Sequence, residues 1–492
     1  MFVAIGQVER SFLGREAFQE IDQVASLGRL AKFAAEPRTA SDVAATMTEA
    51  IRQALTGRPG PVLIDLPIDV QKEIIEYDPD SDFPLEVFKP RPHRKQIDKA
   101  LDMMMEAQHP LIISGGGVII AEASDLLVEL AELTQTPVIP TLMGWGSIPD
   151  DHALNAGMMG LQTMHRYGNA TFLRSDFVLG IGNRWANRQT GSLDVFTKGR
   201  KFVHVDIDPM QIGRVFCPDL GIVGDAKYAL EEFVAAARAR KQAGKITNRK
   251  SWIAEVQERK FTMQRRTDFD NVPIKPQRVF QEINNVFDED TCFVTAIGLY
   301  QIASGQFQKI NKPRNYIVCG QAGPLGWEIS ACTGVKLANP SKEVVGVVGD
   351  YSFQFLIEEL AVAAQHHVPF VMILINNSYL GLIRQAEVGY KMDYQVQLSF
   401  NNINCPEIGE YGVDHVKAVQ AMGCLATRIF DPKLMADAFQ EARRLSKEKR
   451  VPVVVEVITE RVTNISMGPE IDKITEFEEI YDRKPEKKTQ AA

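Results

Sequence analysis

The chain has 492 residues, of which 45% are hydrophobic and 24% charged, and its formal net charge at pH 7 is −8. Because domains usually contain about 100–200 residues, this length predicts several domains. The negative net charge argues against a nucleic-acid partner. The sequence also lacks a run of about 20 apolar residues, which argues against a membrane span.

The N-terminus and the cysteines favour a cytoplasmic location. The opening residues, MFVAIGQVERSFLG, carry neither the basic segment nor the cleavage site of a secretory signal. No C-x-x-C pair occurs among the six cysteines, a pattern that favours reduced thiols over disulfides. The histidines show no zinc-type spacing.

Residues 1–77 predict a small unit of one helix and two strands. The strands are FVAIGQ at 2–7 and PVLIDLP at 61–67. The helix spans 41–57, with Ser41 or Asp42 as its cap and Gly57 at its end. These elements are too few to bury a parallel sheet. We therefore expect that another chain completes this unit, or that the sequence begins partway through a domain.

A proline- and charge-rich linker at 78–95 leads into a second unit, 96–237, in which strands alternate with helices. Such alternation predicts a parallel sheet with helices on both faces. A helix at 95–108 is expected to begin this unit. Expected strands lie at 110–117, 136–141, 176–182 and 201–208, with helices at 121–134 and 163–174.

A basic, partly helical linker at 238–275 separates this unit from a third, 276–465. Strand–helix alternation resumes there at 291–298 and continues to 451–460. The charged tail, 466–492, is expected to be partly disordered beyond about residue 480. The fold class is therefore α/β, built from open parallel sheets that are covered on both faces by helices.

Polar residues follow two apolar runs of the third unit. VVGVVGDYSFQ (344–354) passes through Gly349 into Asp350, and FVMILINNSYLG (370–381) reaches Asn377. A crossover helix is expected at 353–369, which would make the two strands neighbours whose carboxyl ends share one sheet edge. Carboxylate, amide and carbonyl oxygens are ligands that suit Mg²⁺. Each motif alone is typical of a turn or a helix cap, but together they favour a metal–diphosphate site.

The second unit carries a weaker ligand signal. SGGGV at 114–118 is a glycine turn that allows a backbone to approach a phosphate. GIGNRWANR contributes Arg184 and Arg188, and VDIDP contributes Asp206. An acidic residue after such a strand accepts a ribose hydroxyl in dinucleotide folds.

The pairing of GDYSFQ with NNSYLG resembles the thiamine diphosphate signature. The segments GRPGPVLIDLP, SGGGV, PVIPTLMGWG, HVDIDPMQIGR and GQAGPLGW are similar to those of the FAD-containing acetohydroxyacid-synthase-like carboligases. Within that family, DFDNVPIKPQRV, IEELAVAAQHHVPF, NNSYLGLIRQ and VPVVVEVITERVTNISMG resemble the glyoxylate carboligases. The similarity spans nearly the whole chain and is dense from 96 to 475.

The resemblance implies three domains, namely a pyrimidine-binding domain of which 1–77 is the C-terminal part, a central FAD-binding domain and a diphosphate- and Mg²⁺-binding domain. It implies thiamine diphosphate, Mg²⁺ and a structural FAD as cofactors, and small 2-oxo acids as substrates. It also implies active sites shared between subunits of a homodimer or homotetramer. By comparison with the family, the first half of the N-terminal domain is missing, together with the residue that faces the pyrimidine N1′. We therefore expect the N-terminus to fold poorly.

Site residues follow from the same resemblance. The Mg²⁺ ligands would be Asp350, Asn377 and the carbonyl of Tyr379, and Leu325 would hold the cofactor in its bent shape. The diphosphate would lie along Gly298, Leu299, Gln301, Gly349, Asp350, Tyr351 and Ser352. The FAD site would comprise Arg58, Gly115, Gly116, Thr141, Leu142, Met143, Gly182, Arg184, Arg188, Asp206, Ile207, Asp225 and Ala226.

Residues after the Asn-Asn pair suggest a substrate pocket. Leu380, Leu382 and Ile383 would form a dry wall that favours decarboxylation, although ordinary helix packing explains them equally well. Arg384 would hold a carboxylate, or is a surface arginine. Three interpretations stay open. They are a glyoxylate or acetolactate-synthase-like carboligase, an FAD-dependent 2-oxo acid oxidase or acyl-CoA decarboxylase, and a non-catalytic remnant that binds FAD.

Overall fold

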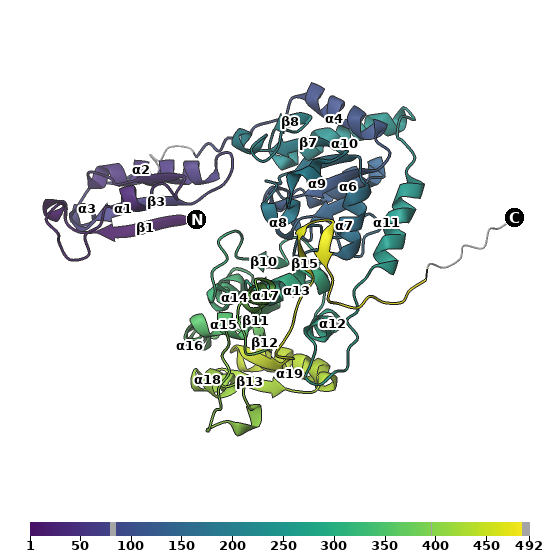
Figure 1. Ribbon diagram of the computed structural model, residues 1–492. Coiled ribbons are helices and arrows are strands. Elements are labelled where there is room, and N and C mark those ends of the chain that lie inside the picture. Colours follow the sequence, from purple (N-terminus) through teal and green to yellow (C-terminus); the bar gives the residue numbers. More distant parts are fainter. Residues whose placement is uncertain (79–84, 395, 485–492) are drawn as a thin grey trace.

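The computed structural model describes residues 1–78, 85–394 and 396–484, and it contains three parallel sheets with helices around them (Figure 1). The predicted α/β class is therefore confirmed. Part of the predicted linker, 79–84, and the end of the tail, 485–492, lie outside the described residues. No helix in the described part of the chain is long and apolar enough to cross a membrane.

The N-terminal unit is set apart from the two larger sheets (Figure 1). Its parallel strands lie in the order β1-β3-β2, so the apolar β3 is central and buried. The helix α2 begins one residue earlier than expected, and its capping box joins Thr39 to Asp42, so the expected cap at Ser41 or Asp42 was wrong. The bounds are β1 Phe2–Gln7, η1 Arg10–Phe12, α1 Gln23–Leu27, β2 Phe33–Ala35, α2 Ala40–Leu55, β3 Val62–Pro67 and α3 Ile68–Lys72.

The middle unit has a five-stranded parallel sheet in the order β5-β4-β6-β7-β8. Alternate residues of β4 face opposite cores, Ile112 toward α4, α6 and α10 and Leu111 toward Trp185 and α7. Its strands are β4 Pro110–Ser114, β5 Val138–Pro140, β6 Phe177–Ile181, β7 Lys201–Asp206 and β8 Leu220–Val223. Its helices are α4 Arg94–Glu106, α5 Gly116–Ile120, α6 Ser124–Thr134, η3 Leu142–Gly144, α7 Arg166–Arg174, α8 Asn187–Thr190, α9 Leu193–Thr197, η4 Pro209–Gln211 and α10 Ala226–Gln242.

The C-terminal unit has a six-stranded parallel sheet in the order β10-β9-β11-β12-β14-β13. One face packs against α12, α13 and α19, and the other against α14, α16 and α18. Its strands are β9 Cys292–Thr295, β10 Tyr316–Val318, β11 Val344–Gly349, β12 Val371–Asn376, β13 Leu425–Ile429 and β14 Val453–Ile458. Its helices are α12 Pro276–Val286, α13 Leu299–Phe307, α14 Trp327–Ala338, α15 Asp350–Phe355, α16 Glu359–Gln365, α17 Gly381–Gly389, η5 Pro406–Ile408, α18 His415–Ala421, η6 Pro432–Leu434 and α19 Met435–Lys449.

The crossover between β11 and β12 differs from the single helix expected at 353–369. It is broken, because α15 ends at Phe355 and Leu356 has non-helical angles of φ −138° and ψ 39°. Phe355 and Leu356 pack tightly on Gly326, where an added methyl group would lie 2.7 Å from Phe355 Cβ. A tertiary contact therefore overrides the local helix propensity.

The predicted linker is partly helical, as expected, and the part of the tail before residue 480 contains a hairpin. The linker contains the end of α10 and α11 Lys250–Thr262, and the tail forms a hairpin from β15 Met467–Glu470 and β16 Lys473–Thr475. This hairpin contacts the middle unit, since Asn169 donates a 3.1 Å hydrogen bond to the carbonyl of Ile471. All six cysteines are free, and four of them are buried.

Candidate functional site

The polar residues after β11 and β12 meet at one edge of the C-terminal sheet. The two strands are parallel neighbours, with Gly349 opposite Ile375. The buried Asp350 carboxylate accepts the backbone N–H of Asn377 at 3.1 Å and of Ser378 at 2.6 Å. The structure thus brings together the two motifs that the sequence placed at neighbouring strand ends.

The oxygens at this edge fit a hard cation. Asn377 Oδ1 is buried without a hydrogen-bond partner, because only the Nδ2 of this amide is used, donating to the Arg461 carbonyl at 3.3 Å. Burial raises the pKa of Asp350 to about 6, while His415 and the backbone donors oppose that shift. No cluster of three His, Cys, Asp or Glu side chains in the described ranges could hold a metal. A cation here would therefore depend on the mixed oxygen set that Mg²⁺ accepts.

A buried polar network lies behind Asn377. Its neighbour Asn376 donates to Glu456 Oε1 at 2.7 Å. Glu456 is also held by His415 Nδ1 at 2.7 Å and by Arg428 Nε at 2.6 Å, and His415 and Arg428 together lower its pKa despite burial. Sequence reasoning missed this network because its members come from β12, β13, β14 and α18. It fixes the backbone from which the Asn377 side chain projects.

A second set of buried hydrogen bonds links α15 to the loop that carries Leu325. Ser352 Oγ accepts the N–H of Gly326 at 3.0 Å and donates to Glu328 Oε2 at 3.1 Å. The amide of Tyr351, a residue expected to border a diphosphate, donates to Asp350 Oδ1 at 2.7 Å. Sequence reasoning missed Glu328, although a charged residue directly after the apolar GPLGW segment is a visible signal.

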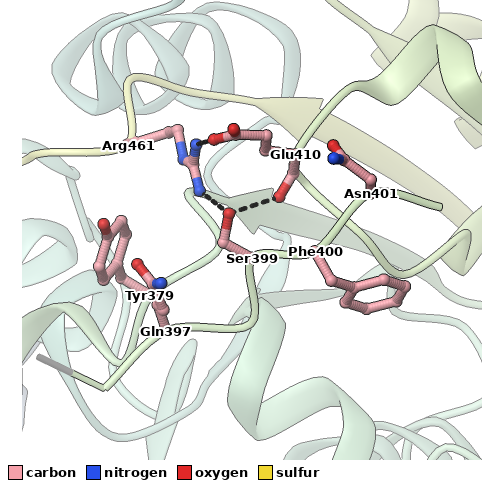
Figure 2. Close-up of a pocket in the computed structure, with 7 residues that line it drawn as sticks. All are labelled: Tyr379, Gln397, Ser399, Phe400, Asn401, Glu410 and Arg461. Carbon is pink, nitrogen blue, oxygen red and sulfur yellow. Dashed lines mark hydrogen bonds and ion pairs between the residues drawn. The ribbon is translucent and has the colours of Figure 1, made fainter.

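A polar pocket of about 280 Å³ opens beside Tyr379 (Figure 2). Figure 2 shows the Arg461 guanidinium ion-paired with Glu410 and hydrogen-bonded to Ser399 Oγ. The guanidinium of Arg384 lies over the Tyr379 ring, 5.2 Å from the ring centroid. The pocket is lined by Tyr379, Gln397, Ser399, Phe400, Asn401, Glu410 and Arg461.

The residues expected to form an apolar wall are spread over several environments. Leu382 packs against the core of the sheet, whereas Ile383 is 43% exposed. Leu325 and Leu380 are half-buried. Leu382 therefore has the packing role that the sequence left open as an alternative, and Leu325 and Leu380 are the apolar side chains available near the strand ends.

The start of α13 lies against this same edge. Gly298 has a φ of +105°, which glycine adopts readily, and Leu299 and Gln301 are buried in the first turn that follows. A methyl group at Gly381 would lie 2.9 Å from Leu299 Cδ2, so α13 and α17 are in close contact. A methyl group at Gly349 would lie 3.0 Å from the Tyr300 ring.

In the middle sheet, the glycines pack against each other instead of leaving an open turn. A methyl group at Gly115 would lie 2.0 Å from the carbonyl oxygen of Gly182, and one at Gly182 would lie 2.7 Å from Gly117 Cα. Gly116 lies against Met143, which is 48% exposed. The absence of side chains at Gly115 and Gly182 is therefore required by loop packing, whatever ligand binds nearby.

Positive charge gathers next to these glycines. Burial lowers the pKa of Arg184, and the nearby Arg58 and Arg214 lower it further. Arg58 also lies 3.8 Å from Asp208 Oδ2, while Arg188 is exposed on α8. Arg214 was not singled out, although it ends the quoted segment HVDIDPMQIGR. This cluster is suited to an anionic ligand.

Some of the other expected FAD-site residues have clear structural roles. Asp225 caps α10 by accepting the N–H of Lys227 at 2.9 Å, with Ala226 as the first residue of that helix. Thr141 caps η3 through the N–H of Gly144 at 3.1 Å, and Leu142 packs on the C-terminal core. Asp206 is buried and accepts the N–H of Asp208 at 2.9 Å, next to the half-buried Ile207.

Two protein-family models match the parts of the chain that contain most of these residues. Residues 97–233 match the model for the central domain of thiamine pyrophosphate enzymes, and residues 296–457 match their C-terminal TPP-binding domain. The chain is 56% identical to a glyoxylate carboligase of Escherichia coli O157:H7, over 97% of this chain and 80% of that protein.

More distant relatives are named for a different activity. A probable acetolactate synthase large subunit of Methanocaldococcus jannaschii is 33% identical over 96% of this chain and 78% of its own length. The acetolactate synthase large subunit of Corynebacterium glutamicum is 33% identical over 93% of this chain and 72% of its own length. With the two domain matches, these relationships show that the chain belongs to the thiamine pyrophosphate enzyme family.

Proposed function

We propose that this protein is a thiamine diphosphate-dependent carboligase that condenses two molecules of glyoxylate to tartronate semialdehyde and releases CO₂. The observation that carries the proposal is the buried Asp350 carboxylate against the Asn377 backbone, with Asn377 Oδ1 unpartnered, inside the matched TPP-binding domain. The 56% identity to a glyoxylate carboligase, against 33% to two acetolactate synthases, favours glyoxylate as the substrate.

Asp350, Asn377 and the carbonyl of Tyr379 would hold Mg²⁺, which in turn would bind the diphosphate. Gly298, Leu299, Gln301, Gly349, Tyr351 and Ser352 would border that diphosphate. When bound, thiamine diphosphate supplies a nucleophilic carbon that adds to a 2-oxo acid carbonyl and takes up the electron pair released with CO₂. The protein itself contributes position, charge and exclusion of water.

Leu325 would support the cofactor in its bent shape, and Leu380 would exclude water from the reacting carboxylate, which favours its loss. Arg384 would orient the substrate carboxylate. Its guanidinium is held over the Tyr379 ring, next to the expected metal position. A planar guanidinium can bind a carboxylate through two hydrogen bonds, which fixes its orientation.

The crevice of the middle sheet would hold FAD without a redox role. Arg58, Arg184 and Arg214 supply the positive charge that a dinucleotide diphosphate requires, and Asp206 supplies an acceptor for a ribose hydroxyl. Family membership further suggests that two copies share each active site in a homodimer or homotetramer in the cytoplasm.

The direct test is product analysis with the purified full chain, glyoxylate, thiamine diphosphate, Mg²⁺ and FAD. We expect tartronate semialdehyde and one CO₂ for every two glyoxylate molecules, with a flavin absorbance that does not bleach. Faster turnover of pyruvate to acetolactate would reassign the substrate. Bleaching of the flavin on addition of substrate would indicate an oxidase and contradict the proposal.

A further inference from the structure

Glu328 is a buried carboxyl group to which the proposed reaction assigns no role. It lies in the first turn of α14 and its exposed fraction is 0%. Oε2 accepts the hydroxyl proton of Ser352 at 3.1 Å, whereas Oε1 is buried without a hydrogen-bond partner. A carboxylate that is buried with one oxygen unpartnered is costly, so this position favours the neutral acid.

Within the described part of the chain, Glu328 forms no ion pair with Lys, Arg or His. Burial raises the pKa values of the Cys319 and Cys332 thiols, and the nearby Glu328 raises them further; Asp350 begins the neighbouring helix α15. Burial raises the pKa of Glu328 to about 7, although Ser352 and nearby backbone groups favour the anion.

The proton of Glu328 decides what the Ser352 hydroxyl can do. A serine hydroxyl has one proton to donate and two lone pairs to accept with. Gly326 N–H occupies one lone pair at 3.0 Å. When Glu328 is ionised, the hydroxyl proton is committed to it. When Glu328 is protonated, the carboxyl O–H donates to the second lone pair of Ser352, and the serine proton becomes free for another acceptor.

We propose that Glu328 is a positioning residue whose protonation, acting through Ser352, strengthens the binding of the cofactor diphosphate. The proton stays on the Glu328 carboxyl, and only the direction of the Glu328–Ser352 hydrogen bond reverses. The neutral form also removes a negative charge from the low-dielectric surroundings of an anionic ligand. This inference rests on the proposed function, since it assumes that Ser352 borders the diphosphate.

The test is calorimetric titration of the full chain with thiamine diphosphate at saturating Mg²⁺, at about pH 6 and about pH 8.5. Wild type is compared with Glu328→Gln and Ser352→Ala. The matched control is Glu282→Gln, since Glu282 is a buried carboxyl on α12, outside the site. The cofactor and Asp350 titrate in the same way in all variants. The readout is therefore the pH ratio, which is the affinity at about pH 6 divided by the affinity at about pH 8.5, compared between each variant and wild type.

As the pH rises between these values, we expect wild type and Glu282→Gln to lose about tenfold more affinity than Glu328→Gln. The reason is that the Glu328 carboxyl, which both proteins retain, loses its proton above about pH 7. Ser352→Ala should bind more weakly at about pH 6 and show a smaller pH ratio than wild type. Equal pH ratios in wild type and Glu328→Gln would overturn the role of Glu328, and a full wild-type ratio in Ser352→Ala would overturn the relay. No binding by wild type at either pH would overturn the proposed cofactor site as well.

Discussion

The two larger sheets share one architecture but present opposite chemistry at the carboxyl ends of their strands. The C-terminal sheet buries an acid, Asp350, beside the unpartnered oxygen of Asn377. The middle sheet gathers Arg58, Arg184 and Arg214 beside glycines that touch backbone to backbone. The contrast teaches that a parallel sheet fixes where a ligand binds, whereas the side chains after each strand decide whether a cation or an anion binds there.

The largest expected effect comes from removing the buried network behind the acidic edge. Glu456→Ala leaves Arg428, His415 and Asn376 without their shared acceptor, so we expect a loss of about 3–5 kcal/mol in the free energy of unfolding. Denaturant unfolding measures this loss. The matched control is Glu441→Ala, which removes an exposed ion pair with Arg444 and should leave stability unchanged. Equal stability of the two variants would show that the network does not support this edge.

A smaller loss is expected from closing the glycine contact in the middle sheet. Gly182→Ala places a methyl group 2.7 Å from Gly117 Cα at a residue whose φ is +59°. Strain and overpacking together should cost about 2–4 kcal/mol. Thermal unfolding with and without FAD checks this expectation. The matched control is Gly199→Ala, which has a φ of +73° but nothing within 4 Å, and it should show only the backbone strain. Equal losses in the two variants would rule out the backbone contact as the cause.

The smallest expected effect comes from changing Asp206, and it tests whether the two proposed cofactor sites act independently. Asp206→Asn keeps one acceptor oxygen but removes the charge that would bind a ribose hydroxyl, so we expect about tenfold weaker FAD binding. Thiamine diphosphate affinity should not change, because Asp206 belongs to the other sheet. Flavin fluorescence and calorimetry measure the two affinities separately. A parallel loss of both affinities would mean that the crevices are not independent.

The sequence predicted the parts of this molecule that depend on local patterns. Strand–helix alternation predicted the parallel sheets, and the abrupt change from apolar to polar at Asp350 and Asn377 predicted their meeting. Both features follow from general rules, namely that crossovers make parallel neighbours and that ligands bind at carboxyl strand ends. The same local patterns singled out Arg184 and Asp206, whose role in FAD binding stays a prediction.

Features that depend on distant contacts were missed. The break in the crossover at Leu356 lies where Phe355 and Leu356 pack on Gly326, and the tail hairpin accepts a hydrogen bond from Asn169. Glu456 reads as part of an apolar strand, and only the folded chain shows His415 and Arg428 around it. The sequence also did not show that Gly115 packs on the backbone of Gly182, and its role at a phosphate stays a prediction.

The most direct test of the central claim is the Mg²⁺ dependence of thiamine diphosphate binding in wild type and Asp350→Ala. Wild type should bind the cofactor with Mg²⁺ and release it on chelation, while retaining FAD. Asp350→Ala should lose at least about 100-fold in Mg²⁺-dependent affinity, because a buried charged ligand is removed. Cofactor affinity in Asp350→Ala equal to that of wild type, with the same response to Mg²⁺, would contradict the assignment of the metal–diphosphate site to the ends of β11 and β12.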